Sequence, residues 1–197
     1  MIVYKECLID EYIPDYMCDE CGKTESGRIR GAVFFHRSLK TQLTQSNFNK
    51  IVWWEQQLQA KTVIVIPSVR GTFDGGAPIN VTGFGDQKEK VTGKNFTAVI
   101  TDGNHTQNYK FYEGLENNYF KNYFFGFITG SEFRVGTDVI LGFHAVDAVS
   151  DDPDSDVPWV STITWKQDKP NSIVPIYELP DDVRDLFVHC IDEIIAE

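Results

Sequence analysis

Six of the chain's 15 glycines fall between residues 71 and 97, and this concentration constrains the fold more than any other feature of the sequence. Glycine adopts the positive φ values that other residues avoid, so repeated glycines indicate a backbone that turns several times. Two dense apolar segments, residues 63–66 and 96–100, flank the stretch. We therefore predict that residues 71–97 form a connector between buried strands, which presents backbone and charge rather than side-chain bulk.

The length and composition favour one packed domain. A chain of 197 residues is long enough to bury a substantial core. Apolar residues make up 42% of the chain and aromatic residues 13%, which argues against global disorder. Aromatic side chains in this number are typical of sheet faces and packed interfaces. We predict a single α+β domain over residues 1–197, built mainly from an antiparallel sheet or sandwich with two or three helices.

Hydrophobic periodicity predicts where the strands and helices lie. The expected strands cover residues 28–39, 61–66, 94–101, 120–129, 132–135, 139–149 and 159–166. The expected helices cover residues 48–59, 106–118 and 180–197. The last is an amphipathic C-terminal helix, which starts at Pro180 and carries Asp181 and Asp182 at its positive end. Its wide apolar stripe must be buried, either on the chain's own sheet or on a neighbouring subunit.

The formal net charge is −11 and the sequence pI is about 4.8. Nucleic-acid affinity depends on Lys and Arg, so we expect no sequence-specific nucleic-acid binding. An acidic surface would suit a protein that lines a passage for DNA, although solubility alone explains the same charge. The N-terminus has no signal-peptide pattern, and no apolar run reaches the ~18 residues that span a bilayer. We expect no membrane association and a reducing compartment.

Cys18-x-x-Cys21 is the strongest chemical motif in the sequence. Two thiolates at this spacing bind one side of a zinc ion, but a structural zinc site needs four ligands. Cys7 and His36 are the candidates for the other two, which would give a Cys₃His set. The alternatives are reduced thiols in a turn and a redox pair. We therefore expect no cofactor. The open alternative is a zinc ion bound by Cys7, Cys18, Cys21 and His36.

The sequence contains no motif of a known catalytic centre. Residues 151–156 lack the Gly and Glu of a calcium loop, and Gly83-Phe-Gly85 lacks the third glycine of a nucleotide loop. No nucleophile elbow and no His-Glu-x-x-His motif is present. We expect a protein that is not an enzyme, with a small metal-dependent or hydrolytic enzyme as an unfavoured alternative. Trp53, Trp54 and the aromatic residues of 119–127 predict core or interface packing, the alternative being stacking on a glycan.

Several short segments follow one another in a recognisable order between residues 18 and 167. They are the Cys18-x-x-Cys21 loop, Gly27-Arg-Ile-Arg-Gly-Ala-Val-Phe-Phe, Ile51-Val-Trp-Trp-Glu, Gly71-Thr-Phe-Asp-Gly-Gly, Gly83-Phe-Gly-Asp-Gln, Val91-Thr-Gly-Lys-Asn-Phe-Thr, Phe111-Tyr112 and Trp165-Lys166. This order resembles a family of virion structural proteins from tailed phages of Bacteroidetes, including the crAss-like phages. The terminal helix and the acidic run of residues 151–156 depart from the family pattern.

The resemblance implies a non-enzymatic protein that is assembled in the host bacterial cytoplasm and retained in the virion. It implies a homo-oligomeric ring of the tail or neck, with sixfold or twelvefold symmetry, around a DNA passage at the portal-to-tail connection. Neighbouring portal and tail proteins would be its other partners. A head-fibre or other capsid-associated binding module is the runner-up.

Subunits of a ring contact their neighbours head to tail, through two different surfaces. We expect the glycine-rich connector to supply one of these surfaces. The residues expected to make inter-subunit contacts are Phe73, Asp74, Phe84, Asp86, Lys88, Glu89 and Lys90.

Overall fold

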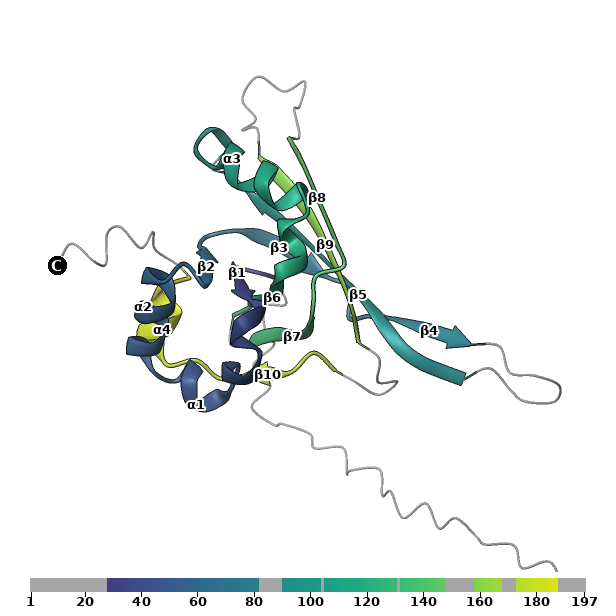
Figure 1. The fold of residues 1–197 in the computed structure, drawn as a ribbon, viewed down its shortest axis with the longest axis horizontal. Coiled ribbons are helices and arrows are strands. Elements are labelled where there is room, and N and C mark those ends of the chain that lie inside the picture. The colour runs from purple at the N-terminus through teal and green to yellow at the C-terminus, as the bar shows by residue number, and fades with distance from the viewer. Residues whose placement is uncertain are drawn as a thin grey trace, which may run out of the picture.

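The computed structural model describes residues 28–81, 90–103, 105–130, 132–147, 158–167 and 173–187. Two antiparallel sheets pack face to face, and helices cover the free face of one of them (Figure 1). The prediction of an α+β fold dominated by antiparallel sheet is confirmed.

Each sheet has a simple strand order. The central sheet has the order β10-β7-β6-β1-β2. Its strands are β1 (Gly31–His36), β2 (Val63–Ile66), β6 (Tyr123–Ile128), β7 (Phe133–Val139) and β10 (Ile176–Tyr177). The outer sheet has the order β3-β5-β9-β8, and β4 also pairs with β5. Its strands are β3 (Arg70–Phe73), β4 (Ala77–Val81), β5 (Lys90–Asp102), β8 (Gly142–Asp147) and β9 (Trp159–Gln167).

Four α-helices and two 3₁₀ helices are formed by the described residues. They are η1 (Arg37–Gln42), α1 (Gln45–Phe48), α2 (Ile51–Gln59), α3 (His105–Glu116), η2 (Tyr119–Asn122) and α4 (Asp181–Asp185). None of these helices is long and apolar enough to cross a membrane.

The central sheet is buried on both faces. Along β1, Val33 and Phe35 belong to the cluster shared with the helices, whereas Phe34 belongs to the cluster shared with the outer sheet. Successive side chains of a strand point to opposite faces, so an uninterrupted apolar strand must have a cover on each side. The sequence Gly-Ala-Val-Phe-Phe meets this requirement, and all five residues are buried.

Trp54 is the centre of the helical layer. Its side chain is fully buried, and its ring lies 5.7 Å from that of Phe35 in β1 and 5.7 Å from that of Phe187 beyond α4. The indole Nε1 donates a hydrogen bond of 3.0 Å to the carbonyl oxygen of Phe48. The ring therefore joins α2, α4 and the central sheet, with its one polar atom satisfied.

The outer sheet has one buried face and one open face. Along β9, Trp159, Ile163 and Trp165 are buried against the central sheet and α3. The alternate residues, including Thr162 and Thr164, are partly exposed on the other face. The strand predicted for residues 159–166 is confirmed.

Helix α3 covers the edge of the outer sheet beside β8 (Figure 1). The Glu116 carboxylate accepts a hydrogen bond of 3.0 Å from the backbone N–H of Ala145 and lies 2.7 Å from His144 Nδ1. In the second half of the helix, the Tyr112 hydroxyl donates to Asp102 Oδ2 at 2.7 Å. Burial, and then the hydrogen bond to Asp102 and its charge, raise the pKa of Tyr112 well above its usual range. This pair is part of the core packing between the helix and β5.

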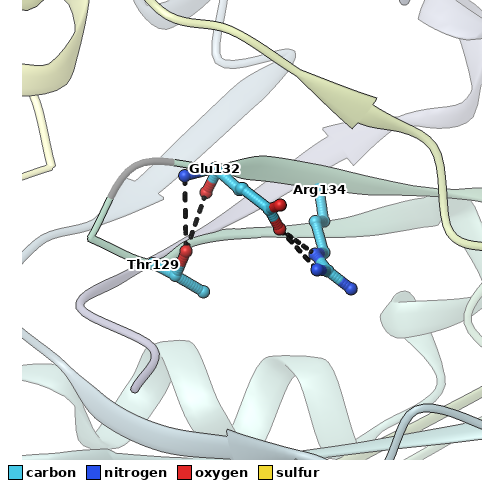
Figure 2. Close-up of polar contacts among 3 residues, drawn as sticks. All are labelled: Thr129, Glu132 and Arg134. Carbon is cyan, nitrogen blue, oxygen red and sulfur yellow. Dashed lines mark hydrogen bonds and ion pairs between the residues drawn. The ribbon is translucent and has the colours of Figure 1, made fainter. Parts of the chain in front are cut away.

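The turn between β6 and β7 is closed by polar contacts (Figure 2). The backbone N–H of Thr129 donates to the Glu132 carbonyl at 2.9 Å, and the Glu132 N–H donates to Thr129 Oγ1 at 3.3 Å. Arg134 Nε donates to the Glu132 carboxylate at 2.8 Å. The predicted hairpin is confirmed, with a return strand that runs to Val139 rather than stopping at Val135.

Several predicted boundaries were wrong. The strand predicted for residues 28–39 ends at His36, where η1 begins. The helix predicted for 48–59 is divided into α1 and α2, and the start of the strand predicted for 120–129 is η2. The strand predicted for 139–149 begins only at Gly142, because Ile140 N donates to Tyr123 in the central sheet whereas Leu141 N donates to Thr164 in the outer sheet. The chain changes sheets between these two residues.

The C-terminal helix is described only in part. Helix α4 begins after Pro180, as predicted, and buries Val183. Leu186 and Phe187 are buried beyond it, against the chain's own α2 layer. The remainder of the predicted helix, residues 188–197, lies outside the described residues.

Candidate functional site

Strand β4 and the first part of β5 form a hairpin arm that extends away from both sheets (Figure 1). We define the arm as residues 77–81 and 90–95. Strand β4 pairs with β5 alone, and β9 pairs with β5 only from Lys94 onward. The prediction that residues 71–97 form a loop connector was therefore wrong for residues 71–73, 77–81 and 90–93, which are strands. The strand predicted to begin at Lys94 begins four residues earlier.

The base of the arm is fixed by Asp74. Its backbone N–H donates to the Thr97 carbonyl at 3.1 Å. Its carboxylate Oδ1 accepts hydrogen bonds from the N–H of Gly76 at 2.9 Å and from the N–H of Thr97 at 3.0 Å. These bonds close the short break between β3 and β4, so both strands pair with β5 along one continuous edge.

Two adjacent glycines in this break differ in the space that a side chain would have. Gly75 and Gly76 have φ of +74° and +96°, values that residues with a Cβ rarely adopt. A Cβ on Gly75 would meet nothing within 4 Å, whereas a Cβ on Gly76 would lie 2.4 Å from the Phe96 ring. Gly76 is therefore required both by its backbone angle and by close packing.

We expect Gly76→Ala to lower the free energy of unfolding by about 2–4 kcal/mol, the sum of backbone strain and overpacking. The matched variant Gly75→Ala has the backbone cost alone, about 1–2 kcal/mol. Urea denaturation of both variants measures the difference. Equal losses would show that the Phe96 ring moves aside without cost.

Two of the predicted contact residues in this region have roles inside the subunit. The Phe73 ring stacks on Phe96 at 5.8 Å and on Trp165 at 5.8 Å, and lies 5.0 Å from Phe127. Asp74 holds the base of the arm, as described above. Lys90 is the first residue of β5. The other predicted contacts, Phe84, Asp86, Lys88 and Glu89, lie outside the described residues.

The arm carries apolar side chains that are exposed among the described residues. Val81 is 50% exposed and Val91 is 36% exposed. Ala77 and Pro78 are also exposed, and Ile79 is partly exposed. A two-stranded hairpin is at best marginally stable in water on its own. Apolar residues on an extended hairpin are therefore expected to gain stability from contact with another molecule.

The edge of β4 is poorly suited to pairing with a further strand. Pro78 pairs with Lys94 and has no N–H, so it offers no donor to an added strand. The register shifts between Ile79 and Asn80, which bends the edge. Proline and bulges are common devices that protect sheet edges from strand addition. Contact with another molecule is therefore expected through the side-chain faces of the arm.

The acidic character of the chain does not come from the described residues. They contain 14 Lys and Arg against 12 Asp and Glu, whereas the whole chain contains 18 and 29. The acidic excess belongs to residues 1–27, 82–89, 148–157 and 188–197. The folded body is thus close to electrically neutral.

The zinc set predicted from sequence is not tested, because Cys7, Cys18 and Cys21 lie outside the described residues. The fourth member, His36, ends β1; its Nδ1 lies 2.8 Å from Ser38 Oγ, and its ring contacts that of Tyr123. Among the described residues, no group of three or more His, Cys, Asp and Glu is placed to hold a metal ion.

Two open depressions lie elsewhere on the surface. One, of about 390 Å³, is lined by His36, Arg37, Ser38, Lys40, Phe124, Asp138 and Val139. The other, of about 580 Å³, is lined by Arg28, Arg70, Gly71, Thr72, Phe73 and Thr101. In the first depression, Ser38 Oγ lies 2.8 Å from His36 Nδ1, and Asp138 lines the same depression. The residues that line the second include no general base.

The two tryptophans considered for glycan stacking are both part of the core. Trp54 is fully buried and Trp53 is 8% exposed. Trp53 Nε1 donates to Gln42 Oε1 at 3.1 Å. The prediction that these rings pack in the core is confirmed, and they present no face to a sugar.

Sequence reasoning missed the strands of the arm that contain Val81 and Val91. Glycine, proline and asparagine are rare in strands, and their presence in the arm obscured the alternation of apolar and polar residues. The available signal was the alternation Ile79-Asn-Val81 on one side of Gly83-Phe-Gly85 and Val91 on the other, which is the spacing of two paired strands.

No known protein family, no curated protein and no solved structure matches the chain.

Proposed function

We propose that the chain is a structural subunit of a tailed-phage virion, which assembles with copies of itself into a ring of the tail or neck around a DNA passage. The observation that carries the proposal is the hairpin arm, which extends beyond both sheets and carries exposed valines at Val81 and Val91 (Figure 1). The order of sequence segments described above supports the same class of protein.

The arm supports self-assembly because it is rigid at its base and unsupported further out. The Asp74 hydrogen bonds and the packing of Gly76 on Phe96 hold its direction relative to the body. A surface displayed at a fixed angle suits a repeating contact, since each subunit must place its neighbour in the same orientation. If the rotations between successive subunits add up to a full turn, the repeated contact closes into a ring.

The near-neutral body is compatible with a DNA passage. Strong phosphate binding depends on clusters of Lys and Arg that outnumber the acidic groups. The described residues hold nearly equal numbers of both, and the rest of the chain is acidic. DNA would therefore move past such a ring without being held by its phosphates.

Light scattering coupled to size-exclusion chromatography of the full chain tests the proposal, together with particle averaging by electron microscopy. We expect a mass that is a multiple of the 22.4 kDa chain and ring-shaped averages. Mass spectrometry of purified phage particles should detect the chain in several copies. A monomer at all concentrations, absent from the particles, would overturn the proposal.

A further inference from the structure

The larger of the two open depressions, of about 580 Å³, gathers positive charge at the β3 end of the outer sheet. Its charged lining residues are Arg28 and Arg70, and both side chains are exposed. The other lining residues are Gly71, Thr72, Phe73 and Thr101, so no carboxylate lines it. Among the described residues, neither arginine forms an ion pair.

The backbone around the depression is fixed by the fold. Arg70 is the first residue of β3 and the cross-strand partner of Thr101 in β5. Gly71 follows it, and a Cβ there would lie 2.4 Å from a carbonyl oxygen of β5, so the two strands approach closely. Ile29 is fully buried, and its N–H donates to the Gly71 carbonyl at 3.2 Å, which anchors Arg28 beside the strand. A ligand would therefore meet a preformed backbone frame.

The carboxylates that adjoin the lining residues in sequence have other partners. The Asp74 carboxylate accepts hydrogen bonds from the N–H groups of Gly76 and Thr97. Asp102 is buried, and its carboxylate accepts from the Tyr112 hydroxyl at 2.7 Å. The positive charge of the depression is therefore not offset by a carboxylate that lines it.

This arrangement has the chemistry of an anion-binding site. Guanidinium groups that line one concave surface repel each other and concentrate anions there. Each presents N–H donors in a planar fork that matches the oxygens of a phosphate or a carboxylate. The hydroxyls of Thr72 and Thr101 are further donors at the same surface. A phosphate group has more oxygens than a carboxylate and carries up to about two negative charges at neutral pH, so it can accept from both arginines together.

We propose that this depression binds a phosphate group, with Arg28 and Arg70 as its charged ligands and the two threonine hydroxyls as additional donors. The inference goes beyond the proposed function and does not depend on self-assembly. Free inorganic phosphate and the backbone of a nucleic acid offer the same chemical group, and the experiment distinguishes these two sources.

Thermal melting of the full chain in inorganic phosphate, against chloride at equal ionic strength, tests the proposal. A ligand that binds only the folded chain raises the melting temperature, and the rise continues with the logarithm of its concentration above the dissociation constant. We expect this rise in phosphate. Arg70→Gln and Arg28→Gln should each weaken phosphate binding at least about tenfold, because each removes charge-assisted hydrogen bonds. Both side chains are exposed, so the melting temperature without phosphate should be unchanged.

Arg37→Gln is the matched control, because it removes an exposed arginine from the other depression. It should bind phosphate as the wild type does. Acetate is the chemical control for a carboxylate ligand. The proposal is overturned if phosphate acts no more strongly than chloride, if acetate acts as strongly as phosphate, or if the three variants lose binding equally.

A short DNA duplex is the second probe. DNA that competes with phosphate on the wild type, and does not bind Arg70→Gln, identifies the nucleic-acid backbone as the source of the group. Phosphate binding that DNA leaves unchanged identifies the free ion. Both results support the site. DNA that binds the wild type and Arg70→Gln equally, with no saturable effect of phosphate on either, overturns it.

Discussion

Replacement of residues 80–92 by Asn-Gly is expected to abolish self-association and to leave the body folded. Ile79 and Gly93 are direct cross-strand partners, so a two-residue turn can join them without changing the strands that remain. The replacement removes both exposed valines and the outer part of the arm, while Asp74 and its bonds to Thr97 stay in place. Light scattering should report a monomer at concentrations where the wild type assembles.

The stability of the shortened chain is the control for this result. The described residues among those removed belong to neither hydrophobic core cluster, and shortening a loop lowers the entropic cost of closing it. The free energy of unfolding should therefore stay within about 1 kcal/mol of the wild-type value. If the shortened chain unfolds, the arm is needed for the fold of the subunit. If the shortened chain folds and still self-associates, the arm does not make the contact between subunits.

The largest loss of stability is expected for Trp54→Ala, about 3–5 kcal/mol. The ring is fully buried between β1, α2 and the residues after α4, so its removal leaves a cavity and an unpaired carbonyl at Phe48. A loss of this size is a large part of the total stability of a typical domain. Chemical denaturation with both fluorescence and circular dichroism measures it.

Val52→Ala is the matched control on the same helix. Val52 is 58% exposed, so its truncation should change the free energy of unfolding by no more than about 0.5 kcal/mol. If Trp54→Ala loses as little as Val52→Ala, the helical layer is not coupled to the central sheet.

Elements with a strong local pattern were predicted well from the sequence. The apolar pattern of residues 159–166 identified β9, and the hydrophobic spacing of residues 106–118 identified α3 to within two residues. The apolar run at Val63–Ile66 identified β2, which is buried on both faces or nearly so. In each case the side-chain pattern and the tertiary environment favour the same structure.

The rest depended on interactions that sequence periodicity does not report. The chain passes from the central to the outer sheet between Ile140 and Leu141, although the apolar pattern continues without a break. The glycine-rich stretch forms strands because β5 supplies a long partner and Asp74 bridges the interruption. Tertiary pairing overrides a low strand propensity in such cases.

The candidate site was predicted by region and not by residue. The stretch 71–97 does contain the arm, but Phe73 faces the core and Val81 faces outward, which only the register with β5 determines. Asp181 and Asp182 were predicted at the positive end of a helix, and they are in the first turn of α4.

The positions of Val183 and Phe187 have a consequence for the order of events during synthesis. Both belong to the cluster that contains Trp54, and the Phe187 ring contacts the Trp54 ring although it lies far later in the chain. The strand β1 likewise pairs with β6, which is synthesised well after it. The layer over Trp54 is therefore completed only after residue 187 has been synthesised.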